Sequence, residues 1–172
     1  MARLWIASYA EYDGSMTFAA RCLILACGNT LREDDGVGPF LAQWAEERWR
    51  DDERVRVMCD HQWTPEMLED VASAETIIFV DCAMDCDAGL VRTMTVEPAP
   101  NNSKLGTHHL EAAQLLTLSR QYFDRMPRSS LLLTVGAGSL ELREGFSPVV
   151  LAALPAAQRA LEESVQRLLE DR

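Results

Sequence analysis

Residues 23–44 read LILACGNTLREDDGVGPFLAQW, and this stretch decides the fold. The apolar run Leu23–Cys27 predicts a buried strand. The Gly-Asn pair after it ends the strand, because both residues tolerate backbone angles that others avoid. From Val37 onwards apolar side chains recur with the spacing of one helix face, and Pro39 suits the first turn of a helix. The stretch therefore predicts a strand, an acidic turn and a helix, and open α/β sheets bind ligands at such turns.

Short apolar runs and amphipathic stretches alternate along the rest of the chain. This alternation predicts a single α/β domain with a mostly parallel central sheet flanked by helices on both faces. Residues 1–20 show no clear period and are expected to form an N-terminal extension to a domain that spans 21–172. Further strands are expected at about 55–59, 76–80, 91–96 and 131–135, with a short edge strand at 140–142. Helices are expected at about 37–49, from 64, at 110–122 and at 147–169, the last broken near Pro155.

The composition indicates a globular protein and excludes some partners. The chain has 172 residues, of which 48% are hydrophobic and 25% charged, and its net charge is −11. Such an acidic chain is expected to bind neither nucleic acid nor an anionic membrane surface, because both are polyanions. No apolar run reaches the length of about 18 residues that a transmembrane helix needs. The apolar piece Leu4–Ala7 is too short for a signal peptide.

Five cysteines are present, which is an odd number. Cys22, Cys27 and Cys59 lie in or beside apolar runs, so the sequence indicates reduced thiols in a cytoplasmic protein rather than a disulfide framework. Cys82 and Cys86 are separated by three residues, but no second cysteine pair completes a tetrahedral metal site. Simple burial is therefore the favoured interpretation for these two thiols.

Side chains that can bind metal follow three of the predicted strands. They are Asp34 and Asp35 after the first strand, Asp81 after the third, and His108 and His109 after the fourth. Because adjacent parallel strands are about 4.8 Å apart, the loops at one edge of a sheet converge. Two carboxylates and one imidazole form a donor set that suits a borderline divalent ion such as Zn²⁺, Ni²⁺ or Co²⁺. The sequence therefore predicts a metal site at this edge.

Each of these residues also has a simpler interpretation. The dipole at a helix N-terminus would stabilise Asp34 and Asp35, Asp81 would cap a turn, and the histidine pair would lie in a solvated loop. His61, the only other histidine, precedes a predicted helix start and is a weaker functional candidate. The sequence has no H-E-x-x-H zinc motif, no G-x-S-x-G nucleophile motif, no P-loop and no dinucleotide fingerprint.

Four motifs together resemble one known family. Residues 28–38 read GNTLREDDGVG and resemble the G-N-x-L-x-x-D-[DE]-G-x-G signature of the nickel–iron hydrogenase maturation endopeptidases. Residues 77–81, 107–110 and 139–148 resemble that family's strand ending in Asp, its histidine motif and its S-x-E-x, G-x-S pattern. One departure is Ala26, where many members have the first glycine of G-x-G-N, but this removes no metal-binding side chain. The resemblance covers about residues 22–168.

The resemblance implies a twisted sheet with helices on both sides, and it also implies an activity. Members of the family remove a short C-terminal extension from the precursor of a nickel–iron hydrogenase large subunit after nickel has been inserted. The metal-contacting and catalytic residues implied are Asp35, Asp81 and His108. His109 is the alternative imidazole because two adjacent histidines leave the register open by one residue, and Asp34 would support the turn or the ligands.

The metal implied is nickel carried by the substrate, or another divalent ion. In this hypothesis the three side chains grip the ion as the recognition element, and the ion polarises the scissile carbonyl or supplies hydroxide. A non-catalytic, chaperone-like module that holds metal or precursor without cutting remains the alternative. A nucleotide-binding, flavodoxin-like domain is disfavoured because Asp34 and Asp35 would repel phosphate.

Overall fold

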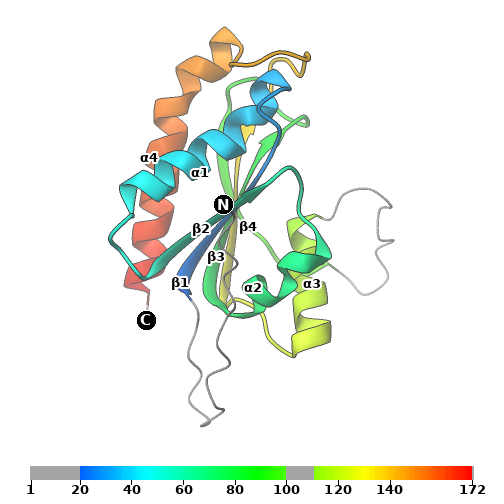
Figure 1. Ribbon diagram of the computed structural model, residues 1–172, viewed down its shortest axis with the longest axis vertical. Coiled ribbons are helices and arrows are strands. Elements are labelled where there is room, and N and C mark those ends of the chain that lie inside the picture. The colour runs from blue at the N-terminus through cyan, green and yellow to red at the C-terminus, as the bar shows by residue number, and fades with distance from the viewer. Residues whose placement is uncertain (1–19, 100–110, 172) are drawn as a thin grey trace, which may run out of the picture.

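The computed structural model describes residues 20–99 and 111–171, which form one five-stranded sheet with helices on both faces (Figure 1). The strands are β1 (Ala20–Cys27), β2 (Val55–Asp60), β3 (Ala74–Ala83), β4 (Val91–Thr95) and β5 (Ser129–Gly136). Their order in the sheet is β2-β1-β3-β5-β4. All pairs are parallel except β4 with β5, which is antiparallel at one edge. The predicted α/β class with a mostly parallel sheet is therefore confirmed.

Within the described residues, two α-helices cover each face of the sheet. They are α1 (Val37–Arg48), α2 (Leu68–Ala72), α3 (Ala112–Phe123) and α4 (Pro148–Glu170). Two 3-10 turns, η1 (Glu33–Gly36) and η2 (Pro65–Met67), precede α1 and α2. Helices α1 and α4 pack on one face, and α2 and α3 pack on the other (Figure 1).

The side chains of β1 divide between two cores. Because successive residues of a strand point to opposite faces, Ile24 packs with α1 and α4, whereas Leu23 and Leu25 pack with α2 and α3. Strand β3 lies beside β1 in the middle of the sheet, and its residues from Ile77 to Val80 are completely buried. Burial on both faces explains why these strands are continuous apolar runs in the sequence.

The register of the sheet brings functional candidates to one edge. Ala26 of β1 pairs with Val80 of β3, and Asp81 pairs with Thr134 of β5. The turn that follows Cys27 and the side chain of Asp81 therefore lie at the same level. This level is the carboxyl edge of the parallel strands, where ligands bind in such folds.

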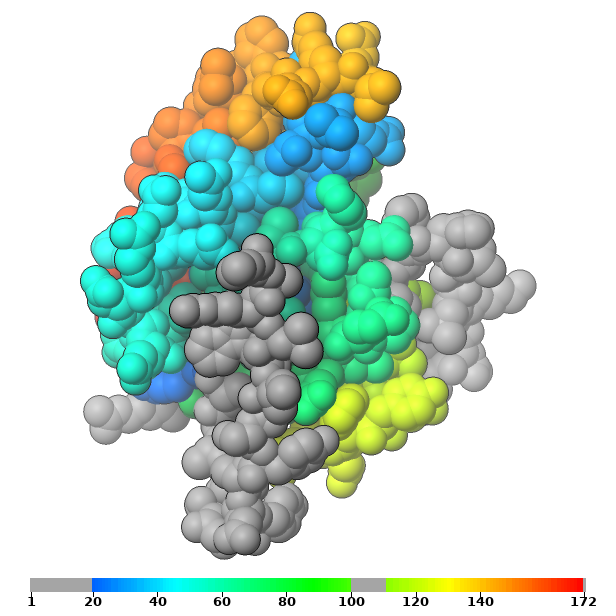
Figure 2. All heavy atoms as spheres, in the orientation of Figure 1, coloured from blue at the N-terminus to red at the C-terminus, as the bar shows by residue number. Residues whose placement is uncertain are grey.

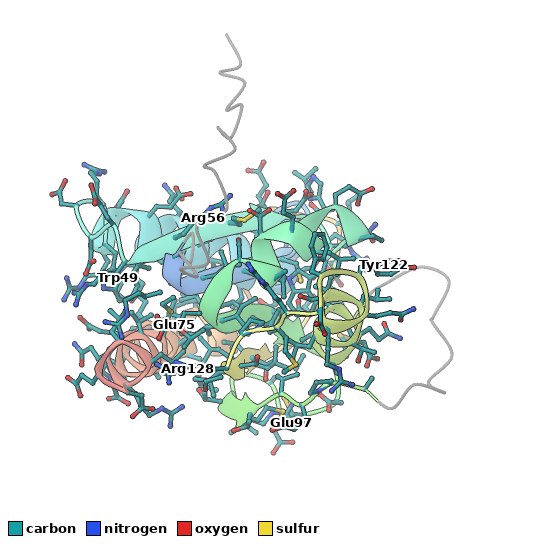
Figure 3. All side chains as sticks on the ribbon, turned by 90° about the horizontal axis from the view of Figure 1, so that it is seen from below. Trp49, Arg56, Glu75, Glu97, Tyr122 and Arg128 are labelled. Atoms are coloured by element: carbon teal, nitrogen blue, oxygen red, sulfur yellow. The ribbon has the colours of Figure 1, made fainter. Side chains whose placement is uncertain are left out.

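Ion pairs connect the strands at the opposite, amino edge of the parallel sheet. Glu75, at the start of β3, pairs with Arg21 of β1 at 3.3 Å and with Arg128, just before β5, at 3.0 Å. Figure 3 shows Glu75 and Arg128 close together, away from the labelled Glu97. None of the helices in the described part of the chain has the length and apolar character needed to cross a bilayer.

Two local expectations are wrong. Helix α4 runs through Pro155 without a break, because apolar side chains on both sides of the proline are buried in the core beneath it. Residues 140–142 form no strand. The backbone N–H groups of Gly138 and Ser139 instead donate to the carboxylate of Asp34, which holds this segment against the acidic turn. The buried side chains of α4 on either side of the proline are Leu154, Leu161, Val165 and Leu168.

Some expectations fall on residues outside the described ranges. The expected N-terminal extension at 1–20 lies there almost entirely. So does residue 110, at which a helix was expected to begin, and α3 as described begins at Ala112. The expected strand at 91–96 ends at Thr95 in the structure.

Candidate functional site

The turn after β1 folds back on itself and fixes Asp35. Gly28 has a φ of +146°, and a Cβ atom there would lie 2.0 Å from the carbonyl oxygen of Asp35, so only glycine fits. The backbone N–H of Asn29 donates to that carbonyl oxygen at 3.2 Å and to Oδ2 of Asp35 at 3.1 Å. The backbone itself therefore positions the Asp35 carboxylate at the sheet edge.

Asp34 points the other way and is completely buried. Its carboxylate accepts hydrogen bonds from the backbone N–H groups of Gly138 and Ser139, both at 2.8 Å. It also accepts the N–H and the hydroxyl of Ser147, both at 2.7 Å. Burial alone would raise the pKa of Asp34, but the hydrogen bonds from Ser147, Ser139 and Gly138 outweigh it and hold the pKa below its usual range. Asp34 is therefore a structural anchor.

Glu33 adds a second tie between the same two segments. Its side chain is completely buried, its φ is +48°, and it is paired with the guanidinium of Arg143. Its backbone N–H donates to the carbonyl oxygen of Arg143 at 2.8 Å. Ser139 and Arg143 together lower the pKa of Glu33. Figure 2 shows the orange segment around residue 140 in contact with the blue acidic turn at the top of the molecule.

Three potential ligand atoms converge beside this turn. Carboxylate oxygens of Asp35 and Asp81 and the sulfur of Cys82 all lie within 4.8 Å of one another. Oδ1 of Asp81 accepts the backbone N–H of Cys82 at 2.8 Å, and Sγ of Cys82 lies 3.5 Å from Oδ1 of Asp35. Each of the three residues is partly buried. The donor set of two carboxylates and a thiol fits a borderline divalent ion.

A pocket of about 600 Å³ opens over these three residues. One wall carries Trp63, whose ring packs edge-to-face on Phe79 with centroids 5.2 Å apart. The indole Nε1 of Trp63 is buried and has no hydrogen-bond partner among the described residues. His61 and Gln62 also line the pocket from the loop after β2.

The thiols of the pocket are held in their protonated form. Burial raises the pKa of Cys82, and the neighbouring carboxylates of Asp81 and Asp35 raise it further. Burial also raises the pKa of Cys27, which lines the same pocket, and Asp81 adds to that effect. Because the thiolate and not the thiol is the nucleophile, neither side chain is set up as the nucleophile of a cysteine peptidase.

The structure brings together part of the predicted site. Asp35 and Asp81 lie side by side in the pocket, as their positions after two neighbouring strands led us to expect, and their binding of a metal stays a prediction. Asp34 is not in the cluster. His108 and His109 lie outside the described residues. His61, the weaker candidate, is exposed at the pocket.

Cys82 and Trp63 are pocket residues that sequence reasoning did not assign to the site. Cys82 was expected to be simply buried, but its thiol belongs to the cluster. Its position directly after Asp81, at the end of a central strand, is the signal that could have identified it. Trp63 was not named among the candidate site residues, and the sequence alone does not distinguish a core aromatic side chain from one that lines a pocket.

Comparisons with known proteins point to one family. No protein-family model matches the sequence. The hydrogenase 2 maturation protease of Escherichia coli K12 is 27% identical over 146 residues, which cover 82% of this chain and 88% of that protein. The coenzyme F420 hydrogenase subunit delta of Methanothermobacter thermautotrophicus is 28% identical over 155 residues, covering 86% of this chain and 97% of that protein.

Solved structures agree with the sequence relatives. The hydrogenase maturating endopeptidase HybD from E. coli matches with a TM-score of 0.74 and 25% identity, over 86% of this chain and 93% of that one. The hydrogenase maturation protease HycI from Thermococcus kodakarensis has the same fold, with a TM-score of 0.62 and 21% identity, over 93% and 96% of the two chains. In sequence and fold, this chain is similar to the hydrogenase maturation proteases, which are endopeptidases.

Proposed function

We propose that this protein removes the C-terminal extension from the precursor of a nickel–iron hydrogenase large subunit after nickel insertion, and that it recognises the bound nickel. The observation that carries the proposal is the convergence of Asp35 and Asp81 in one pocket at the carboxyl edge of the sheet. The names of the relatives support the hydrolytic activity. His108 is proposed as the third ligand, with His109 as the alternative.

In this mechanism the nickel is part of the substrate. Asp35 and Asp81 bind it as carboxylates, and the anchors at Glu33 and Asp34 keep the acidic turn in place while they do so. A bound divalent ion supplies Lewis-acid chemistry at a carbonyl group. We expect the chain to be cut to lie in the pocket around the two carboxylates, whose lining is partly apolar.

The free thiols favour a reducing compartment. All five cysteines, each within the described residues, are unpaired. Disulfides form in oxidising compartments and thiols persist in the cytosol. We therefore place the processing reaction in the cytoplasm.

The test is a processing assay with nickel-loaded precursor, in which mass spectrometry follows loss of the extension. Asp35→Asn, Asp81→Asn and His108→Ala should each reduce processing at least about a hundredfold, because each removes a ligand and not merely a partner of one. Asp51→Asn, the same change at an exposed aspartate after α1, serves as the matched control. Full activity in the three ligand variants would refute the assignment, and loss of activity in His109→Ala alone would move the imidazole by one residue.

A non-catalytic role has one observation in its favour. The relative from M. thermautotrophicus is named as a subunit of a hydrogenase and not as a protease. A module of this kind would hold the precursor through the same carboxylates without cutting it. If the precursor keeps its mass while it co-purifies with this protein and nickel, the binding role is favoured over the peptidase.

A further inference from the structure

Two cysteine thiols lie at the candidate metal site, although the predicted ligands are carboxylates and an imidazole. Cys82 belongs to the cluster itself, and Cys27 lines the same pocket. We propose that the Cys82 thiolate is a direct ligand alongside Asp35 and Asp81, and that the pocket binds a thiophilic divalent ion such as Co²⁺, Ni²⁺ or Zn²⁺ without the precursor. This inference rests on the proposed function, because it keeps the two aspartates as ligands.

The spacing of the donor atoms fits a shared ion. Sγ of Cys82 lies 3.5 Å from Oδ1 of Asp35. With bonds of about 2.3 Å to sulfur and about 2.1 Å to oxygen, a tetrahedral ion holds these two atoms about 3.6 Å apart. Asp81 places its oxygen within 4.8 Å of both atoms, so small rotations of side chains complete the arrangement. The three side-chain donor atoms therefore already lie at distances compatible with one shared ion.

A separate observation indicates that the pocket is built for an occupant. Trp63 is 7% exposed, lines the pocket, and has a buried Nε1 without an acceptor among the described residues. A buried donor left unpaired costs about 1–3 kcal/mol, which an acceptor on a bound ligand would recover. Met84 and Met94 add two exposed thioethers to the lining. A water molecule carried by the bound ion could supply such an acceptor, and the ion would meet sulfur atoms in the same lining.

The thiolate decides which ions the pocket takes. Binding breaks the S–H bond of Cys82, and the proton passes to the buffer as the sulfur–metal bond forms. Ions that prefer oxygen, such as Mg²⁺ and Ca²⁺, gain little from a sulfur ligand, whereas Co²⁺, Ni²⁺ and Zn²⁺ gain more. The site is thereby selective for the class of ions that includes the proposed cargo.

The experiment uses Co²⁺ alone, added to the full chain without precursor, because a cobalt–thiolate bond absorbs in the near ultraviolet. Wild-type protein should show this charge-transfer absorption, and an excess of Mg²⁺ should not remove it. Cys82→Ser, which nearly preserves the side-chain volume, and Cys82→Ala should both lose the absorption and bind Co²⁺ at least about tenfold more weakly. Thermal melting of each variant confirms that it is folded.

Two thiol variants make the assignment specific. Cys59→Ala removes an exposed thiol that does not line the pocket, and Cys27→Ala removes the neighbouring thiol that does. Both should keep the absorption. Absorption that survives in Cys82→Ser, absorption lost only in Cys27→Ala, or absence of Co²⁺ binding by the wild type would each overturn the inference. The processing assay with Asp35→Asn is independent of these results, so the proposed function can stand where the thiolate ligand fails.

Discussion

At the scale of single residues, Asp34 holds the geometry of the site together. It lies next to Asp35 in the chain, but its four hydrogen-bond donors come from residues at least 104 positions later. One buried carboxylate thus connects the acidic turn to the segment before α4 and to Ser147, which caps that helix. Asp34 has no place in the cluster, yet the position of Asp35 depends on it.

Replacing this carboxylate by an amide should destabilise the fold. In Asp34→Asn, only one oxygen remains to accept, and the new NH₂ group faces backbone donors. Each buried donor left unpaired costs about 1–3 kcal/mol, so we expect a loss of roughly 2–4 kcal/mol in the free energy of unfolding by urea. Asp51→Asn, on the surface, should change it by no more than about 0.5 kcal/mol. Equal stability of the two variants would contradict the role assigned to Asp34.

The effect of Asp34→Asn on the free energy of unfolding should also depend on pH. The pKa of Asp34 is lowered in the folded state, whereas in the unfolded chain an aspartate titrates near about 3.9. The stabilisation is therefore fully present above about pH 4 and is lost as the pH falls through the folded-state pKa. The difference in unfolding free energy between wild type and Asp34→Asn should shrink in acid. A constant difference from pH 7 to pH 3 would exclude this carboxylate as its source.

At the scale of elements, the spacing of apolar residues predicted the strands and helices that bury apolar side chains in the core. The strand at 23–27 and the helix from Val37 follow directly from apolar spacing, because both bury their apolar side chains in the core. The segment at 140–142 was predicted as a strand from local apolarity alone. Its neighbours bond to a carboxylate that is distant in sequence, and no local pattern reveals such a partner.

Some residues of the candidate site were likewise predictable from the sequence, and others were not. Asp35 and Asp81 could be brought together from the sequence because parallel strands end at one edge of the sheet. Cys82 could not be assigned to the site in this way, because the sequence pattern of a cysteine after an apolar run is the same for a core residue and for a metal ligand. That the Trp63 indole has no hydrogen-bond partner within the described residues is a property of three-dimensional packing, so only the structure reveals it.

Pro155 is the element-scale feature most open to a stability test. It sits inside α4 with an exposed side chain, so it removes a backbone hydrogen bond without filling the core. Pro155→Ala should therefore raise the free energy of unfolding by about 1–3 kcal/mol, since proline is about 3 kcal/mol less favourable than alanine within a helix. Differential scanning calorimetry should show a higher Tm. A lower Tm would mean that the proline ring makes stabilising contacts in the folded protein.

At the scale of the whole molecule, the five thiols report on how the chain opens. Cys22 is completely buried and burial raises its pKa to about 12, whereas the Cys59 residue is exposed and partial burial of its thiol raises the pKa only to about 11. Iodoacetamide should therefore label Cys59 in the native protein and reach Cys22 only after unfolding, because alkylation needs an accessible thiolate. Mass spectrometry of peptides labelled with and without urea measures both. Equal native labelling of the two thiols would show that the β1 core opens without global unfolding.

The hydrogen bonds to the Asp34 carboxylate determine when the acidic turn can be fixed during synthesis. A nascent polypeptide that has emerged only as far as β3 already carries both aspartates, yet every donor for Asp34 is still to be translated. The acidic turn is locked only when the ribosome has delivered Ser147 and the helix behind it. A chain interrupted before Ser147 would contain Asp35 and Asp81 but would lack hydrogen bonds that hold the acidic turn in place. The site is therefore completed late in synthesis.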